Sequence, residues 1–333
     1  MPRCAATVVR SDYEGLNQSI IPSRLDEPRM RVLVTGASGF IGRHCIPYLL
    51  EAGHEVHAVV RTPVETSGPI WHRVDLLSPA APSRLISIVQ PAALLHLAWC
   101  TTHGEYWSSP ENLRWAQASL ELIHASSTAK CKRVVLAGTS AEYDWSFGVC
   151  SETLTPLRPV SLYGASKCAV YSVLEKFGTL AGMSWCWARI FNVYGPHEDP
   201  RRLVPSIIRS LLNRKEARIP VVEEKRDFLH VADVARALVM LVESGFSGAV
   251  NIGSGEAVTI QDMIQRIASA LGQRRQLQMA STVSTVPLVQ AQIDILTNEI
   301  GWKPRYSLET GVADAVAWWQ GHSSNLLKPP TGG

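Results

Sequence analysis

The sequence predicts an α/β protein with a doubly wound parallel sheet and a smaller C-terminal α/β lobe. Two observations favour this class. Short apolar runs at 32–35, 55–60, 93–97 and 133–137 alternate with segments of helical periodicity, as in successive βαβ units. The first of these strands also leads directly into three regularly spaced glycines. The chain has 333 residues, of which 46% are hydrophobic, so it can bury a substantial core.

The segment 32–42 combines a strand, a tight turn and the start of a helix. The missing side chains of Gly36 and Gly39 would let a pyrophosphate approach the backbone, and Gly42 would let the helix press on the strand. Amide groups at the helix N-terminus would then face the phosphate charge. The turn predicts a dinucleotide site, although a purely structural turn remains an alternative. The residues between the glycines that we expect to contact the ligand are Ser38, Phe40 and Ile41.

Residues at later strand ends indicate how such a ligand would be bound. The second strand ends at Arg61, where an acidic residue would bind the 2′-hydroxyl of NAD and an arginine accepts a 2′-phosphate. We therefore expect NADP(H) to be preferred and NAD(H) to be possible, unless Arg61 is only a solvated loop residue. Asp75 could reach the adenine or cap a turn. His96 lies inside an apolar strand, which is more typical of a satisfied core residue than of a catalyst. Further cofactor contacts are expected at Leu76, Leu97 and Ala98.

Tyr163 and Lys167 are the predicted catalytic pair. They are four residues apart at the start of a predicted helix, which places them on one face. A nearby cation stabilises a phenolate, so Lys167 is expected to lower the pKa of Tyr163 towards the working range while its other donors bind a ribose. A hydroxyl at the preceding strand end, Thr139 or Ser140, would bind the substrate oxygen beside the tyrosine.

With this glycine turn and this pair in the same order, residues 30 to 320 resemble the extended short-chain dehydrogenase/reductases. The resemblance is to the NAD(P)-dependent nucleotide-sugar epimerases, dehydratases and 4-ketoreductases, and it implies a Rossmann-like fold. The family's catalytic hydroxyl lies four residues before a tyrosine that corresponds to Tyr143, which makes Thr139 the first choice and Ser140 the second.

The same resemblance implies how the chain is divided and where the substrate binds. Residues 30–190 would form the dinucleotide domain with the catalytic residues, and 191–325 mainly a substrate lobe with some elements returning to the sheet. We expect a flexible extension over 1–29 and a tail over 326–333. Asn192 would contact a nucleotide-sugar and Arg226 its diphosphate. Either Arg201 or Arg202 could also meet the diphosphate, with Arg202 preferred; a solvated charged turn is the alternative.

Two positions depart from the family pattern. Many members carry an active-site asparagine in the helix corresponding to 110–127, and the alignment places Trp115 there. A proton relay through that asparagine would be absent or rerouted. Dehydratases usually place an Asp-Glu pair directly after the catalytic hydroxyl, whereas Thr139 is followed by Ser140 and Ala141. Glu142 could still serve as a base.

The leading hypothesis is NADPH-dependent reduction of the 4-keto group of a nucleotide-activated 4-keto-6-deoxy sugar. The alternative is an NAD-dependent nucleotide-sugar 4-epimerase; a dehydratase or an inactive nucleotide-binding relative fits less well. The family resemblance also implies a homodimer in which the two long helices near 110–127 and 162–181 pack into a four-helix bundle.

Composition argues against several other classes. The net charge of +3 comes from 32 basic and 29 acidic residues without a basic stripe, so nucleic acid is not an expected partner. No apolar run is long enough to span a membrane. The seven cysteines form no Cys-x-x-Cys pair, which is typical of reduced thiols in a cytoplasmic protein. No metal site is predicted.

Overall fold

The computed structural model describes residues 29–62, 67–213, 217–221, 224–272, 277–281 and 288–322. The extension predicted over 1–29 therefore lies outside the described residues except for Arg29. The tail predicted over 326–333 also lies outside them.

A seven-stranded parallel sheet forms the larger part of the molecule, with strand order β11-β7-β5-β4-β1-β2-β3. This confirms the predicted fold class. The order reverses between β1 and β4, and ligands of such sheets bind at the carboxyl ends of the strands beside this reversal. The strands are β1 (Arg31–Thr35), β2 (Glu55–Val60), β3 (Ile70–Arg73), β4 (Ala93–His96), β5 (Arg133–Thr139), β7 (Ser184–Ile190) and β11 (Gly248–Ile252).

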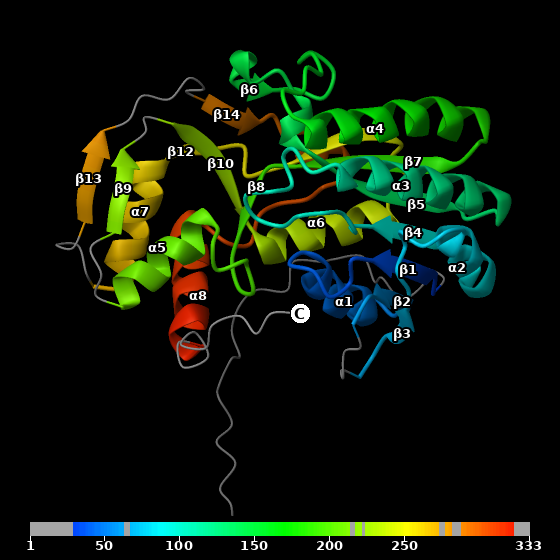
Figure 1. The fold of residues 1–333 in the computed structure, drawn as a ribbon, viewed down its shortest axis with the longest axis horizontal. Helices are drawn as coiled ribbons and strands as arrows, with labels where there is room; N and C mark the ends of the chain where they lie inside the picture. The colour runs from blue at the N-terminus through cyan, green and yellow to red at the C-terminus, as the bar shows by residue number, and fades with distance from the viewer. Residues whose placement is uncertain are drawn as a thin grey trace, which may run out of the picture.

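Helices cover both faces of this sheet (Figure 1). Successive side chains of a strand point to opposite faces, so Val32 and Val34 of β1 pack in one core while Leu33 packs in the other. The first core is completed by α1 (Gly42–Glu51) and α6 (Val231–Glu243). The second is completed by α2 (Ala81–Val89), α3 (Glu111–Thr128) and α4 (Leu162–Leu180). The strands therefore read as continuous apolar runs because both faces are buried.

The smaller lobe is built mainly from later segments and lies on the left in Figure 1. Its helices pack around a separate core that includes Ile208, Met263 and Val316. They are α5 (Leu203–Leu212), α7 (Ile260–Ala270) and α8 (Leu308–Gly321). The lobe also contains a sheet of strand order β12-β10-β14-β6, in which β8 pairs with β10. A second, two-stranded sheet is formed by β9 and β13. The bounds are β6 (Val149–Cys150), β8 (Asn192–Tyr194), β9 (Ala217–Val221), β10 (Lys225–His230), β12 (Ala257–Thr259), β13 (Leu277–Ser281) and β14 (Leu288–Ala291).

The chain crosses between the two parts several times. It leaves the main sheet after β7, returns with α6 and β11, and leaves again to form β12 and α7. One exchange runs the other way, because β6 precedes α4 in sequence but pairs with β14 of the lobe. The sequence did not indicate this pairing, since a strand of two residues carries almost no periodic signal.

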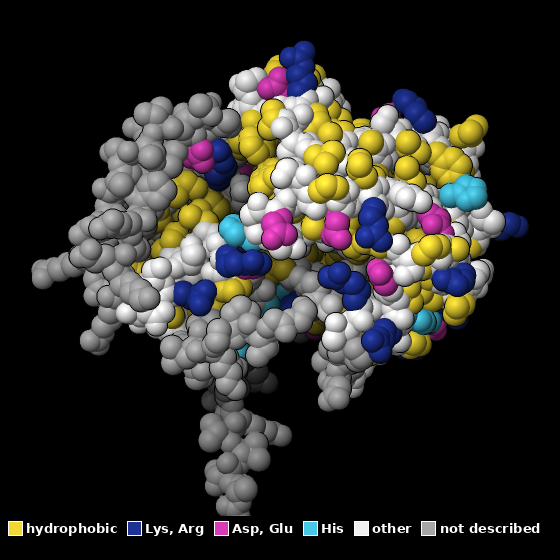
Figure 2. Space-filling model, in the orientation of Figure 1, with side chains coloured by type: hydrophobic (Ala, Val, Ile, Leu, Met, Phe, Trp, Pro, Cys, Tyr) yellow, Lys and Arg dark blue, Asp and Glu magenta, His cyan; other side chains and the backbone are white. Residues whose placement is uncertain are grey.

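The described residues show no membrane helix and no metal-binding cluster. None of their helices combines the length and hydrophobicity needed to cross a membrane. No group of three or more His, Cys, Asp or Glu within the described ranges could hold a metal ion. The six described cysteines are free. Figure 2 shows acidic and basic side chains interspersed on the face that it views, without a patch of one sign.

Candidate functional site

A cavity of about 900 Å³ is lined by residues from the carboxyl ends of the main-sheet strands and from the smaller lobe. It brings together every residue predicted for the site except Asp75 and the two residues offered as alternatives, Arg201 and Glu142. The predicted residues that line it are Gly36, Ser38, Gly39, Phe40, Ile41, Gly42, Arg61, Leu76, Leu97, Ala98, Thr139, Ser140, Tyr163, Lys167, Asn192, Arg202 and Arg226.

Asp75 caps a turn beside this cavity. Its Oδ1 accepts a hydrogen bond from the backbone N–H of Leu77 at 3.1 Å, and its side chain is exposed. Asp75 therefore matches the second of the two predicted alternatives, the turn cap. Its neighbour Leu76 is buried on the cavity wall instead.

The glycine turn fits the diphosphate of a dinucleotide. Gly36 has φ of +68°, and a Cβ there would lie 2.8 Å from the backbone nitrogen of Ala98. A Cβ on Gly42 would clash with the carbonyl oxygen of Gly36. Gly42 thus lets α1 close on the turn itself, where we had expected contact with the strand below. Gly36 lets the turn pack on the end of β4, which leaves the N-terminus of α1 facing the cavity.

Helix α4 begins where its first turn meets the end of β5. The Oγ of Ser161 accepts a hydrogen bond from the N–H of Gly164 at 3.1 Å and caps the helix. A Cβ on Gly164 would clash with the carbonyl of Ala141, so the helix approaches this loop closely. The cap and the close approach place Tyr163 beside Thr139, and the two side chains are hydrogen-bonded.

Thr139 and Ser140 are both buried, and both line the cavity. Thr139 is the last residue of β5, and its Oγ1 also accepts a hydrogen bond from the N–H of Ala141 at 3.2 Å. The carbonyl of Ser140 accepts a hydrogen bond from the Nε1 of Trp145 at 2.7 Å. The hydrogen bond to Tyr163 supports Thr139 as the first choice for the catalytic hydroxyl.

Aromatic rings enclose Tyr163. The ring centroids of Tyr106, Trp107 and Trp99 lie 5.1, 5.9 and 6.4 Å from that of Tyr163. Burial raises the pKa of Tyr163, against the smaller opposing effect of its hydrogen bond to Thr139. The expected lowering of this pKa by Lys167 is therefore not present. Helical spacing predicted that Tyr163 and Lys167 lie on one face, and both line the cavity, but it gave no sign of the aromatic enclosure that desolvates the phenol.

Lys167 is held by other groups of the cavity wall. Its Nζ donates a hydrogen bond to the carbonyl of Ala137 at 2.8 Å and lies 3.7 Å from the ring centroid of Trp99. Burial lowers the pKa of Lys167 to about 7, and the charge of Glu142 opposes this shift. A lysine near neutrality responds strongly to any anionic group that enters the cavity.

His96 and Trp115 are both buried, with different consequences. The Nδ1 of His96 lies 2.6 Å from the Oγ1 of Thr35, and its Nε2 lies 2.8 Å from the Oγ of Ser119. Burial lowers the pKa of His96 to about 3, so it is a neutral, hydrogen-bonded core residue. Trp115 lines the cavity and stacks on Trp99 with centroids 6.5 Å apart. An indole ring thus occupies the place aligned with the family's asparagine.

Asn112 is a supporting residue that sequence analysis missed. It is fully buried, and its Oδ1 accepts a hydrogen bond from the Nε1 of Trp99 at 2.8 Å. Its Nδ2 donates to the carbonyls of Tyr106 and Ser109 at 2.7 and 2.8 Å. Asn112 therefore anchors the loop after β4, which carries Trp99 and Tyr106, to α3. A lone polar residue on the buried side of an amphipathic helix is the signal that could have identified it.

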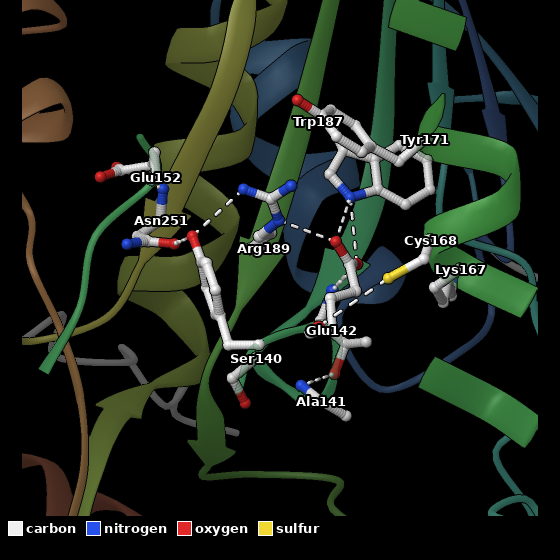
Figure 3. Close-up of polar contacts among 12 residues, drawn as sticks. Ser140, Ala141, Glu142, Glu152, Lys167, Cys168, Tyr171, Trp187, Arg189 and Asn251 are labelled. Atoms are coloured by element: carbon white, nitrogen blue, oxygen red, sulfur yellow. Dashed lines mark hydrogen bonds and ion pairs between the residues drawn. The ribbon is translucent and has the colours of Figure 1, made fainter. Parts of the chain in front are cut away.

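A buried polar network lies behind the loop that begins at Thr139 (Figure 3). The Oε2 of Glu142 accepts a hydrogen bond from the Nε of Arg189 at 2.7 Å, and its Oε1 accepts the N–H of Thr139 at 2.8 Å. The Nε1 of Trp187 lies within 3.0 Å of both carboxylate oxygens. Glu142 is fully buried and turned away from the cavity, so the structure does not support the catalytic base left open for it.

The network continues through Arg189 towards the smaller lobe. Burial alone would lower the pKa of Arg189, but the charge of Glu142 and the neighbouring Tyr143 raise it instead. The hydroxyl of Tyr143 accepts a hydrogen bond from the Nη1 of Arg189 at 3.2 Å and donates to the Oδ1 of Asn251 at 2.7 Å. Asn251 in turn donates to the carbonyls of Cys150 and Gln292. Hydrogen bonds thus connect the loop that begins at Thr139 to β6 and to the segment after β14.

The two candidate arginines after β8 take different positions. Arg201 binds Asp199 through two hydrogen bonds of 3.0 and 2.7 Å and is largely exposed. Arg202 lines the cavity with its guanidinium 5.7 Å from the ring centroid of Tyr106. The geometry therefore favours Arg202 as the residue that can meet a diphosphate.

The other predicted substrate residues line the same wall. Asn192 donates through Nδ2 to the carbonyl of Asp227 at 3.1 Å, and Arg226 forms an ion pair of 2.9 Å with Glu224. Glu198 also lines the cavity and was missed by sequence analysis. It is buried, and its Oε2 has no hydrogen-bond partner among the described residues.

Comparisons with known proteins give the family of this chain. The model of the NAD dependent epimerase/dehydratase family matches residues 32–253. A UDP-glucose 4-epimerase of Halalkalibacterium halodurans is 23% identical, over 88% of this chain and 96% of its own. A GDP-6-deoxy-D-mannose reductase of Pseudomonas aeruginosa is 27% identical, over 87% of this chain and 97% of its own. The solved structure of MoeE5 with UDP-glucuronic acid and NAD is 31% identical, with a TM-score of 0.77, over 87% of this chain and 99% of that one.

The matched residues contain the glycine turn, Thr139, Tyr163 and Lys167, which are the features on which the sequence-based resemblance depended. That resemblance is confirmed, because the matching family model describes NAD-dependent enzymes. The chain belongs to the NAD dependent epimerase/dehydratase family.

Proposed function

We propose that this chain is an NADPH-dependent ketoreductase that reduces the 4-keto group of a nucleotide-activated 4-keto-6-deoxy sugar. The observation that carries the proposal is that Tyr163, hydrogen-bonded to Thr139, shares one cavity with the glycine turn and with Arg61. The GDP-6-deoxy-D-mannose reductase of Pseudomonas aeruginosa, 27% identical to this chain, supports it.

In this proposal the chain's residues bind the two ligands and deliver a proton. The glycine turn would hold the cofactor diphosphate, Arg61 its 2′-phosphate, and Lys167 the ribose next to the nicotinamide. Bound NADPH supplies the hydride. The hydroxyl of Thr139 would hold the substrate oxygen beside Tyr163, which donates its proton to the forming alkoxide. Arg202 and Arg226 would bind the diphosphate of the sugar nucleotide, and Asn192 would contact the sugar nucleotide as well.

The protonation state of Tyr163 suits the proposed reduction. Burial raises its pKa, so the phenol stays protonated at neutral pH and is ready to act as an acid. A 4-epimerase uses the same tyrosine as a base when it oxidises its sugar and as an acid when the hydride returns, so this pKa does not separate the two reactions. The relative from Halalkalibacterium halodurans, a UDP-glucose 4-epimerase, makes an NAD-dependent 4-epimerase the second candidate. A dehydratase fits less well because Glu142 is bound to Arg189 and Trp187, away from the cavity.

A direct assay separates the candidates. The purified full-length chain is incubated with NADPH and with dTDP-, CDP- or GDP-linked 4-keto-6-deoxy sugars, and NADPH absorbance is followed. Stoichiometric loss of NADPH with one of them is the expected result. In a parallel incubation with NAD⁺ and UDP-glucose, interconversion of UDP-hexoses without net change of the cofactor would instead establish the epimerase. Tight cofactor binding without turnover of any sugar would indicate an inactive relative.

Replacement of Arg61 by alanine is expected to lower kcat/KM for NADPH by about ten- to a hundredfold, because a charge-assisted hydrogen bond to the 2′-phosphate contributes about 1.5–3 kcal/mol. The value for NADH should hardly change. Initial rates with each cofactor measure this ratio. Arg73→Ala removes an exposed arginine at the end of the neighbouring strand β3 and serves as the control. An equal loss with both cofactors would contradict the proposed contact.

We further propose a homodimer in which α3 and α4 of two copies form a four-helix bundle. The two helices lie side by side (Figure 1), and they carry the exposed apolar residues Leu113, Val173 and Leu180. Sedimentation equilibrium of the purified protein should give twice the mass of one chain, and a single-chain mass at micromolar concentration would rule the dimer out. Because the described cysteines are free thiols, we also propose that the enzyme works in the reducing cytoplasm.

A further inference from the structure

Glu198 is a buried carboxyl group with unused hydrogen-bonding capacity on the cavity wall. Its side chain is 5% exposed, and its Oε2 contacts no hydrogen-bond donor or acceptor within the described ranges. The backbone of Gly195 forms a hydrogen bond to the carboxyl group and holds it in place. Buried polar atoms are almost always hydrogen-bonded, so an unpartnered oxygen on a residue that lines a ligand cavity calls for a functional explanation.

The charged groups near Glu198 contact other residues. Asp199 binds Arg201 outside the cavity, and the Nδ1 of His197 lies 2.7 Å from the Nη1 of Arg43 on α1. The guanidinium of Arg202 lies over the ring of Tyr106. None of these groups is hydrogen-bonded to the free oxygen of Glu198, and Glu198 itself lines the cavity.

We propose that Glu198 is a specificity residue of this site and that its carboxyl group hydrogen-bonds a hydroxyl group of the nucleotide-activated sugar. The inference rests on the proposed function, because it takes the ligand class from that function. It adds a residue that recognises the sugar itself, whereas the predicted arginines recognise only the diphosphate.

The protonation of Glu198 suits a cavity that receives two anionic diphosphates. Burial raises the pKa of Glu198 to about 8, Arg202 opposes this shift and Asp199 adds to it. At neutral pH the group is therefore mainly a neutral carboxyl, which can donate and accept a hydrogen bond without repelling phosphate. Above pH 8 the carboxylate loses its donor and adds a negative charge, so sugar-nucleotide binding should weaken.

The test measures binding and not turnover. Holoprotein saturated with NADP⁺ is titrated calorimetrically at pH 7 with UDP-, dTDP- and GDP-glucose and with UDP, dTDP and GDP. We expect Glu198→Ala to weaken binding of the nucleotide sugar about tenfold while the free nucleotide binds as before. Glu198→Gln keeps a donor and an acceptor and should restore most of the affinity. Glu299→Gln, at an exposed carboxylate on the described surface, is the matched control.

A pH series supplies an independent measurement. The affinity of the wild type for the nucleotide sugar should fall as pH rises through about 8, and that of Glu198→Gln should not show this component. Lys167, whose pKa lies near 7, and His197, whose pKa is lowered to about 4, titrate in both proteins and cancel in the comparison.

Two outcomes would overturn the inference. The first is unchanged affinity of Glu198→Ala for the nucleotide sugar; the second is an equal loss for nucleotide sugar and free nucleotide, which would show a structural role. A wild type that binds as expected but consumes no NADPH would overturn the proposed reduction alone. A wild type that binds none of the six probes and consumes no NADPH with any of the keto sugars would overturn both.

Discussion

Replacement of Tyr163 by phenylalanine is expected to lower kcat by about 10²- to 10⁴-fold, the usual contribution of a positioned proton donor. The substitution removes the hydroxyl that bonds Thr139 but keeps the ring that packs against Tyr106, Trp107 and Trp99. Cofactor affinity should therefore remain close to that of the wild type. Steady-state kinetics with the best keto sugar and fluorescence titration with NADPH measure the two quantities.

The matched control for this variant lies on the same helix. Tyr171, two turns after Tyr163, donates a hydrogen bond to Glu175 at 3.1 Å and does not line the cavity. Tyr171→Phe should leave kcat within about a factor of two, because Tyr171 does not line the cavity and phenylalanine keeps the ring that packs on Trp187. Wild-type turnover in Tyr163→Phe would show that the proton comes from another group.

Replacement of Arg189 by methionine is expected to lower the free energy of unfolding by about 3–5 kcal/mol, because it leaves the fully buried carboxylate of Glu142 without its ionic partner. The loss should also disturb Thr139, whose N–H bonds the same carboxylate. Urea unfolding followed by tryptophan fluorescence measures the change.

A double variant tests whether the effect comes from the pair. Glu142→Gln combined with Arg189→Met removes both charges and should be more stable than Arg189→Met alone. The exposed pair Glu175–Lys176 provides the control, because Lys176→Met should leave the free energy of unfolding close to that of the wild type. A free energy of unfolding for Arg189→Met that is equally close to the wild type would contradict the role of the buried pair.

Local spacing explains what could be predicted from the sequence. Gly36, Gly39 and Gly42 shape one turn, and Tyr163 and Lys167 share one helix face, so each arrangement follows from a few neighbouring residues. The alternation of strands and helices then predicted the main sheet. The cavity places these local features together because the carboxyl ends of parallel strands meet at one edge of a sheet.

The features that sequence analysis missed depend on contacts between distant segments. The partners of Glu142 come from β7, the free oxygen of Glu198 is recognisable only when its surroundings are known, and β6 finds its place through β14. The predicted direction of the pKa shift of Tyr163 was wrong for the same reason, because the residues that desolvate Tyr163 come from the loop after β4.

The chain passes several times between the main sheet and the smaller lobe, and this limits how the lobe can be exchanged between members of the family. The smaller lobe is not one continuous insert, because α6 and β11 interrupt it and β6 is contributed from within the catalytic half. A chimera that exchanges this lobe with that of a relative needs junctions near 191, 231 and 252, together with a matching graft at 149–150. Transplanting residues 191 onward as one cassette would remove an edge strand and a covering helix from the host's central sheet.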